Sequence, residues 1–142
     1  MIEHTLKIVP IERNHMTEVI EILQAISKFK PKISELDIIW KNFINQQNVF
    51  SMVALQNNHV VGYGSIVIEN KIRGGKLGHI EDIVTSENYY RKGIGKLILN
   101  SLYKISVEHN CYKISLSCKE DNIPFYKKCL YEQNGLSMNR ML

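Results

Sequence analysis

The chain has 142 residues, 44% of them hydrophobic, a length and composition that suit one domain with a core of its own. Its net charge of +4 is mild and its cations are scattered, which excludes the broad basic footprint of a nucleic-acid-binding protein. Three cysteines without a C-x-x-C pair and five histidines without i,i+4 spacing indicate neither a disulfide framework nor a metal site.

The N-terminal part of the chain predicts a strand followed by two helices. Residues 5–11 form a short β-rich run. Apolar residues at helical spacing predict a helix over residues 15–29, capped by Asn14, and a second helix over residues 33–47. The apolar stripe of the second helix contains Trp40, which we interpret as a core residue rather than a binding residue.

The remainder of the chain predicts a hairpin, a crossover and a C-terminal strand. Its elements are strands at 48–55 and 60–69, a glycine-containing loop at 70–79, a strand at 79–86, a helix at about 93–109, a strand at 111–118, a short helix at 120–130 and a strand at 135–142. The order β-α-α-β-β-β-α-β-α-β is typical of an α+β fold with a mixed, mostly antiparallel central sheet flanked by helices. The strands on either side of the β-α-β crossover should be parallel. No linker or repeat is visible, so we expect a single domain over residues 1–142.

A glycine pair in "YYRKGIGKLILNSLYK", residues 89–104, opens the third predicted helix. The stretch is not a dinucleotide fingerprint, because the third glycine position holds Ile98, and "GGKL" at 74–77 is not a Walker loop. Free N–H groups at the start of a helix attract anions, and a pyrophosphate would fit. A glycine-started helix with solvated lysines explains this stretch equally well. The nearby cations are Arg91, Lys92 and Lys96.

Two longer segments carry a family resemblance. "GHIEDIVTSENYYRKGIGKLILNSLYKIS" (78–106) and "CYKISLSCKEDNIPFYKKCLY" (111–131) resemble the GNAT acetyltransferase superfamily and, within it, the glucosamine 6-phosphate N-acetyltransferases. The resemblance implies the GNAT fold and acetyl transfer from acetyl-CoA to the 2-amino group of D-glucosamine 6-phosphate, giving N-acetylglucosamine 6-phosphate for UDP-N-acetylglucosamine biosynthesis. It also implies a homodimer in which each active site is completed by the partner.

The resemblance assigns a set of residues to acetyl-CoA. The backbone of a β-strand would pair with the pantetheine arm, a loop of backbone amides would hold the pyrophosphate, and Tyr126 would point at the thioester sulfur. A phenol of ordinary pKa, about 10, can donate a proton to a departing thiolate. The residues assigned in this way are Ile83, Val84, Thr85, Arg91, Lys92, Gly93, Ile94, Gly95, Lys96, Asn122, Tyr126 and Lys128.

For the amine substrate, the matched acids are Glu81 and Asp82. Consecutive strand residues face opposite sides, so only one acid should meet the sugar unless a bulge intervenes, as is known for the fourth strand of this family. Lys113 shares a strand face with Ser117 and is a candidate for the sugar phosphate. The full set of substrate candidates, several of which are as easily read as exposed polar groups, is Ser27, Lys71, Arg73, Glu81, Asp82, Lys113, Ser117 and Arg140.

The sequence departs from the family pattern at two places. Ser117 stands where the family commonly has an acid, and a serine hydroxyl is a poor base at neutral pH. We therefore hypothesise that Glu81 or Asp82, directly or through a water, takes the proton of the ammonium group. Arg91 occupies a position often held by glycine and follows one place after the expected Arg or Gln, so the path of the pyrophosphate loop is open.

Three other functions stay in view. A GNAT enzyme acting on a peptide, a polyamine or an aminoglycoside is supported by the missing acid at Ser117. A binding module that holds acetyl-CoA without turnover would bind CoA and release no thiol. A small nucleic-acid binder would need a basic face that the sequence does not indicate. The first residues lack the layout of a signal peptide and no apolar run reaches about 18 residues, so we expect a cytoplasmic protein without a membrane partner.

Overall fold

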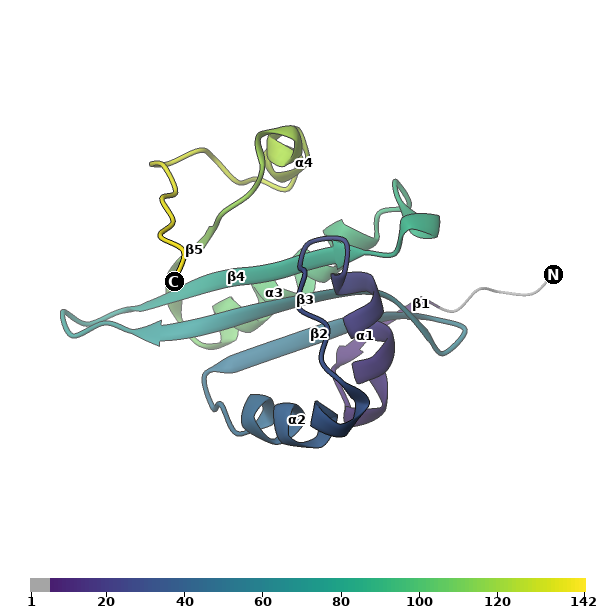
Figure 1. Ribbon diagram of the computed structural model, residues 1–142. Coiled ribbons are helices and arrows are strands. Elements are labelled where there is room, and N and C mark those ends of the chain that lie inside the picture. Colours follow the sequence, from purple (N-terminus) through teal and green to yellow (C-terminus); the bar gives the residue numbers. More distant parts are fainter. Residues whose placement is uncertain (1–5) are drawn as a thin grey trace.

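The computed structural model describes residues 6–142 and contains one five-stranded sheet with the strand order β1-β2-β3-β4-β5 (Figure 1). β1 to β4 are antiparallel neighbours, whereas β5 runs parallel to β4. This confirms the predicted mixed sheet. Thr5, at the start of the first predicted strand, lies outside the described residues. The strands are β1 (Leu6–Pro10), β2 (Val49–Gln56), β3 (His59–Asn70), β4 (Lys76–Thr85) and β5 (Cys111–Leu116).

Helices cover both faces of the sheet. Figure 1 shows α1 in front of the sheet and α3, the crossover helix between β4 and β5, behind it. No helix within residues 6–142 has the length and apolar character needed to cross a membrane. The cytoplasmic location stays a prediction. The helices are α1 (Met16–Leu23), α2 (Leu36–Ile44), α3 (Ile94–Glu108) and α4 (Ile123–Lys128).

The first helix differs from its prediction at both ends. Asn14 does not cap it, because Asn14 lies inside a 3₁₀ turn, Arg13–His15, that leads into α1. α1 also ends at Leu23 rather than near residue 29. The Gln24 side chain closes the end by donating hydrogen bonds to the carbonyl oxygens of Ile20 (3.1 Å) and Phe29 (2.9 Å). These bonds satisfy two carbonyls without another helical turn.

The prediction of a C-terminal strand over residues 135–142 is wrong. Residues 129–142 contain no helix or strand, and their large apolar side chains are almost fully exposed. A strand requires a neighbouring strand for its backbone hydrogen bonds, and none of the strands within residues 6–142 pairs with residues 135–142. β5 is also shorter than predicted, so Ser117 lies just beyond its end. The exposed side chains are Leu130, Leu136, Met138, Met141 and Leu142.

The core lies mainly between α3 and the sheet. Ile66, Ile98 and Leu102 are each 0% exposed there. Two glycines on β3 let the helix approach closely: a Cβ atom at Gly64 would lie 2.6 Å from Ile98 of α3, and one at Gly62 would lie 2.7 Å from the same residue. Contacts this short exclude a side chain, so the glycines set the distance between helix and sheet.

Candidate active site

A bulge in β4 presents the two predicted acids. Tyr63 pairs with Val84 and Ser65 pairs with Glu81, so two β4 residues, Asp82 and Ile83, lie opposite the single β3 residue Gly64. Asp82 takes the left-handed conformation, with φ of 56°. The extra residue interrupts strand alternation. Both acids are exposed, and neither side chain has a hydrogen bond or ion pair within residues 6–142.

Beyond the bulge, β4 has a free edge. β5 pairs with β4 only from Lys76 opposite Cys111 to Ile80 opposite Leu116, whereas β4 continues through Glu81–Thr85. After β5 the chain turns away from β4 towards α4 (Figure 1). The β4 backbone in this segment therefore offers N–H and C=O groups to an extended ligand, as an edge strand offers them to an added strand.

The glycine loop places backbone amides at the start of α3. Gly93 is the N-cap residue of α3 with φ of 79°, and Arg91 takes a similar left-handed conformation with φ of 62°. Arg91 thus adopts the conformation that a glycine at this position would adopt freely. The first N–H groups of a helix lack intrahelical partners, and left-handed residues in the approach form an anion-binding concavity. Three exposed cations surround it: Arg91, Lys92 and Lys96.

α4 carries Tyr126 towards this helix start. The Tyr126 ring meets the rings of Phe125 and Tyr131 edge-on, with centroids 5.0 and 6.0 Å apart. A Cβ atom at Gly95 would lie 3.0 Å from the Phe125 ring, so α4 packs on the first turn of α3. Burial, with a smaller contribution from the nearby Cys118, raises the pKa of Tyr126 to about 12. The phenol therefore remains a hydrogen-bond donor at neutral pH.

The other cofactor candidates lie at the ends of α4 or on β4. Asn122 is the N-cap residue of α4 and is exposed, and Lys128 is the last residue of this helix and is also exposed. Val84 is buried beneath the free edge, whereas Ile83 and Thr85 are half-buried. The structure thus gathers the free edge of β4, the start of α3 and α4 on one side of the molecule.

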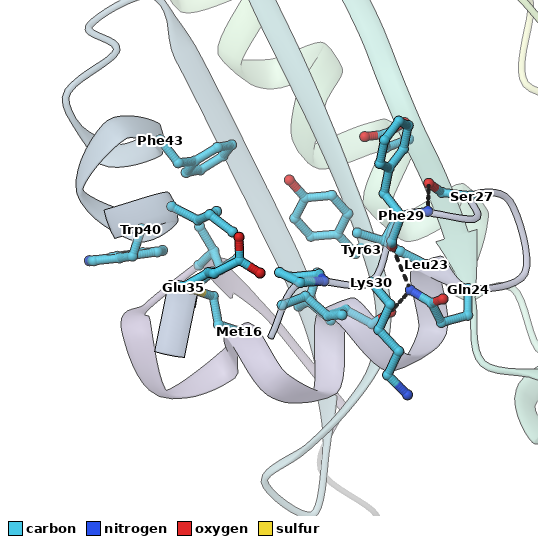
Figure 2. A pocket seen from close by; sticks show the side chains of 16 residues that line it. Met16, Leu23, Gln24, Ser27, Phe29, Lys30, Glu35, Trp40, Phe43 and Tyr63 are labelled. Atoms are coloured by element: carbon cyan, nitrogen blue, oxygen red, sulfur yellow. Dashed lines mark hydrogen bonds between the residues drawn. The ribbon is translucent and has the colours of Figure 1, made fainter. Parts of the chain in front are cut away.

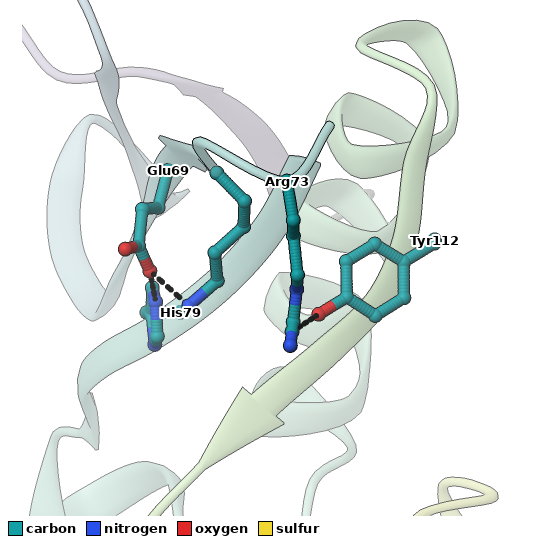
Figure 3. Close-up of polar contacts among 5 residues, drawn as sticks. Glu69, Arg73, His79 and Tyr112 are labelled. Atoms are coloured by element: carbon teal, nitrogen blue, oxygen red, sulfur yellow. Dashed lines mark hydrogen bonds and ion pairs between the residues drawn. The ribbon is translucent and has the colours of Figure 1, made fainter. Parts of the chain in front are cut away.

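The predicted phosphate-binding cations do not lie near the two acids in this chain. Lys71 forms an ion pair with Glu69 (3.1 Å), and Arg73 donates a hydrogen bond to the Tyr112 hydroxyl (3.1 Å), both at the β3–β4 hairpin (Figure 3). Asp82 is six positions further along β4 than Lys76, which lies at this hairpin. That spacing corresponds to roughly 20 Å along an extended strand. Sequence reasoning grouped these residues, but a single chain keeps them apart.

The remaining substrate candidates are dispersed. The Lys113 ammonium group lies 5.9 Å from the centre of the Tyr112 ring, near the same hairpin. Ser117 is exposed after β5, and Arg140 is exposed in the segment without secondary structure. Ser27 lies after α1, where its hydroxyl accepts a hydrogen bond from the Phe29 N–H (3.1 Å). Among these, only Ser27 shares a cavity with one of the acids.

That cavity, of about 550 Å³, lies between α1, α2 and the sheet (Figure 2). Asp82 lines it together with Ser27, and most of its other walls are apolar. Trp40, interpreted from the sequence as core, is instead half-buried, lies in the cavity wall and stacks on Phe43 with a centroid distance of 6.2 Å. The apolar lining consists of Ile11, Met16, Val19, Ile20, Leu23, Phe29, Pro31, Ile39, Trp40 and Phe43.

Sequence reasoning missed Tyr63, which also lines the cavity. Tyr63 is only 5% exposed and comes from β3, far in sequence from α1 and α2. One signal was available: the residue stands between two glycines in "GYG", residues 62–64, an unusual place for a large aromatic side chain in a strand.

Comparisons with known proteins agree with this geometry. The model of the acetyltransferase (GNAT) family matches residues 16–130. Glucosamine 6-phosphate N-acetyltransferase 1 of Dictyostelium discoideum is 44% identical over 89 residues, 61% of this chain and 57% of that protein, so the match spans little more than half of that relative. Glucosamine 6-phosphate N-acetyltransferase of Schizosaccharomyces pombe is 33% identical over 70% of this chain and 92% of its own length. The crystal structure of the Arabidopsis thaliana enzyme of the same name superposes with a TM-score of 0.89, at 26% identity, over 96% of this chain and 98% of that chain.

Proposed function

Since the chain belongs to the acetyltransferase (GNAT) family, we propose that it transfers the acetyl group of acetyl-CoA to the 2-amino group of D-glucosamine 6-phosphate. The product is N-acetylglucosamine 6-phosphate, a precursor of UDP-N-acetylglucosamine. The observation that carries this proposal is the similarity to proteins of that activity, which extends over 92% of the Schizosaccharomyces pombe relative. The exposed acids at the β4 bulge supply the polar groups that an amine acceptor needs.

Acetyl-CoA would bind along the side of the molecule that β5 leaves open. The β4 backbone at Ile83, Val84 and Thr85 would pair with the pantetheine amides, because this segment has no strand neighbour on that side. The amides of the Arg91–Lys96 loop would bind the pyrophosphate, helped by the positive end of the α3 dipole. Asn122 and Lys128, at the two ends of α4, would contact the pantetheine arm and the phosphates.

The reaction is a direct attack on the thioester. The amine lone pair adds to the carbonyl carbon, the C–N bond forms, the C–S bond breaks and CoA leaves as a thiolate. The nitrogen then loses its second proton, which passes through water to the thiolate, so that the products are the amide and CoA as a thiol. The acceptor must first lose a proton from its ammonium form. Ser117 is a poor base, so Glu81 or Asp82, directly or through a water, receives this proton.

Tyr126 would stabilise the leaving thiolate mainly by a hydrogen bond. With a pKa of about 12, Tyr126 is a weaker acid than an alkyl thiol of pKa about 8.5. Full proton transfer from the phenol to the sulfur is therefore uphill by about 3.5 units, or about 5 kcal/mol. The raised pKa of Tyr126 makes full proton donation to the sulfur, the role expected from the resemblance, unfavourable. The hydroxyl would then contribute by stabilising the negative charge of the thiolate.

The central test is a thiol-release assay with acetyl-CoA and glucosamine 6-phosphate. The pH profile of kcat/KM is then compared among wild type, Glu81→Gln and Asp82→Asn, with Glu108→Gln at the far end of α3 as the exposed-acid control. We expect at least one of Glu81→Gln and Asp82→Asn to lose activity. The pH profile of that variant should also lose the fall in kcat/KM at low pH that titration of the acid causes. Unchanged rates in both would reject the base assignment, and no thiol release by the wild type would reject the acceptor.

We infer further that the enzyme is a homodimer with shared active sites. Two observations support this inference: Lys71 and Arg73 lie at the hairpin that begins β4, whereas Asp82 lies near its other end, and residues 135–142 expose four large apolar side chains with no strand partner among the described residues. A second copy would bury this segment and bring the cations of one hairpin to the acids of the other chain.

Co-expression of two inactive variants tests the shared site. Arg73→Ala is paired with whichever of Glu81→Gln and Asp82→Asn is inactive alone, and the mixed dimers should regain activity, because one of the two sites then receives both intact residues. Co-purified mixed dimers without activity would contradict the sharing, and a monomer by sedimentation equilibrium would contradict the dimer.

The apolar cavity favours a second candidate function. Its lining suits an amine with a less polar body than a sugar phosphate, such as a peptide N-terminus. Side-by-side thiol release with glucosamine 6-phosphate, a short peptide, spermidine and an aminoglycoside separates the two candidates. Binding of acetyl-CoA without thiol release with any amine would instead indicate a non-catalytic binding module.

A further inference from the structure

Three buried hydroxyl groups lie beneath the bulge of β4. Tyr63 donates a hydrogen bond to the Ser51 oxygen (3.1 Å), and the Ser51 and Ser65 oxygens are 2.7 Å apart. All three residues are at most 6% exposed. Ser65 is the β3 partner of Glu81, so this cluster lies directly beside the acids.

The hydrogen-bond partners determine where the three protons point. The Ser65 hydroxyl donates to the Phe50 carbonyl oxygen (3.5 Å), which leaves Ser51 as the donor of the hydrogen bond between the two serines, while the Ser51 oxygen accepts from Tyr63. Each hydroxyl has one proton and can accept further hydrogen bonds. The Tyr63 proton is thereby used inside the protein, and the lone pairs of its oxygen remain as acceptors.

Tyr63 and Asp82 line the same cavity. Figure 2 shows the Tyr63 ring between Phe43 and Phe29, within the ring of lining residues. Burial raises the pKa of Tyr63, and the nearby negative charge of Asp82 raises it further, so the phenol stays neutral. The Asp82 carboxylate is itself unpaired within residues 6–142. The cavity therefore sets the Tyr63 and Asp82 oxygens among mainly apolar walls, whose other polar side chains are Gln24, Ser27, Lys30 and Glu35.

We propose that Tyr63 and Asp82 together bind the amino group of the acceptor, each accepting one of its N–H bonds. A neutral primary amine has two N–H bonds and one lone pair. When both N–H bonds point towards these acceptors, the lone pair points away from them and is available for the thioester carbon. This proposal rests on the proposed acetyl transfer and adds to it a binding residue that orients the nucleophile.

The decisive variant is Tyr63→Phe, which keeps the ring and leaves the hydrogen bond between Ser51 and Ser65 in place. A hydrogen bond between two neutral groups, here the phenol and the amine, once removed, weakens binding about two- to tenfold. We expect the KM for the amine to rise by about this factor, while the KM for acetyl-CoA and the melting temperature stay near the wild-type values. Tyr103→Phe, which removes an exposed hydroxyl from α3, is the matched control and should change neither KM.

A second variant tests the role of the buried hydroxyls. Ser51→Ala removes the group that receives the Tyr63 proton, so this proton is free to point into the cavity and oppose the amine N–H. The KM for the amine should rise in this variant also. The double variant Tyr63→Phe with Ser51→Ala should be no worse than Tyr63→Phe alone, because Ser51 acts through the Tyr63 hydroxyl.

The outcomes separate this proposal from the proposed function. An unchanged amine KM in Tyr63→Phe would overturn it, as would an equal rise in the KM of both substrates, which indicates a structural role. If the wild type releases no thiol with glucosamine 6-phosphate but does so with spermidine or a peptide, the acceptor assignment fails, and the same comparison is made with that amine. Wild-type inactivity with every amine overturns both.

Discussion

Two regions of the molecule contribute to the candidate site in contrasting ways. The packed core, formed by β2, β3, β4 and α3, contains side chains with 0% exposure and glycines that bring α3 against the sheet. The C-terminal region, residues 107–142, contains no fully buried residue, although it carries Tyr126 and Asn122. Stability therefore resides in the packed core rather than in the C-terminal region, whose side chains are half-buried or exposed. Low local stability is common in segments that close on a ligand.

The largest expected effect is loss of the central side chain of the packed core. Ile98→Ala removes atoms from a position with 0% exposure, so we expect the free energy of unfolding to fall by about 2–5 kcal/mol. Leu97→Ala, next to it and 41% exposed, is the control and should cost less than about 1 kcal/mol. Urea denaturation measures both. Equal losses would contradict the assignment of stability to the packed core.

Two glycine substitutions compare packing inside the core, at Gly64, with packing between α3 and the C-terminal region, at Gly95. At Gly64 a new Cβ atom would lie 2.5 Å from Ile83 and 2.6 Å from Ile98, and we expect Gly64→Ala to lower the free energy of unfolding by about 1–3 kcal/mol. At Gly95 the nearest atom is on the Phe125 ring, which is 36% exposed and can move. Gly95→Ala should change stability by less than about 1 kcal/mol, because alanine also favours the helix. Denaturation curves that reverse this order would contradict the comparison.

We expect the free energy of unfolding to fall at high pH because of two tyrosines in the C-terminal region. Burial raises the pKa values of Tyr126 and Tyr131 to about 12, whereas an unfolded tyrosine titrates near 10. Their contribution is fully present below pH 10 and is lost as pH rises from 10 to 12, because the unfolded chain ionises first. Because both side chains are part-exposed and solvent screening reduces the effect, the loss by pH 11 is less than about 1.4 kcal/mol per tyrosine.

Urea denaturation at pH 9 and pH 11 measures this loss. The wild type is compared with Tyr126→Phe and Tyr131→Phe combined, since lysines and other tyrosines also titrate in this range. The double variant should lose less stability between the two pH values. An identical loss in both proteins would show that these hydroxyls are as well solvated in the folded chain as in the unfolded chain.

The smallest expected effect is a gain in the free energy of unfolding, from a substitution in the C-terminal region. Leu130, just after α4, is 93% exposed and takes the left-handed conformation with φ of 72°. A leucine there costs about 1 kcal/mol more than a glycine, so Leu130→Gly should raise the free energy of unfolding by about that amount. Leu136→Gly, equally exposed but without a positive φ, is the control and should give no gain.

The parts of the fold and site that could be predicted depend on local patterns. The element order up to α4, the antiparallel hairpin and the parallel crossover followed from runs of β-forming residues and apolar residues at helical spacing. The start of α3 followed from its glycines. The 135–142 strand was mispredicted because its pattern is that of a strand, yet pairing depends on a neighbour that the described part of the chain does not provide.

The cavity could not be predicted because its walls are distant in sequence. Residues 11–43 meet Tyr63 and Asp82 only after α1 and α2 have packed against the sheet. For the same reason Trp40 was assigned to the core, although its apolar stripe forms one wall of an open cavity. No periodic pattern distinguishes these two environments.

The sequence by itself determined most of the segments that become strands and helices and indicated the glycine loop, because those signals depend on residue types at short spacing. The acids and Tyr126 came from the family resemblance. The tertiary structure alone decided the left-handed path at Arg91, the bulge that exposes Glu81 and Asp82 together, and the hydroxyl cluster that orients Tyr63. These features depend on strand register and on contacts between distant segments, and the free energy that holds them comes from packing that no single segment contains.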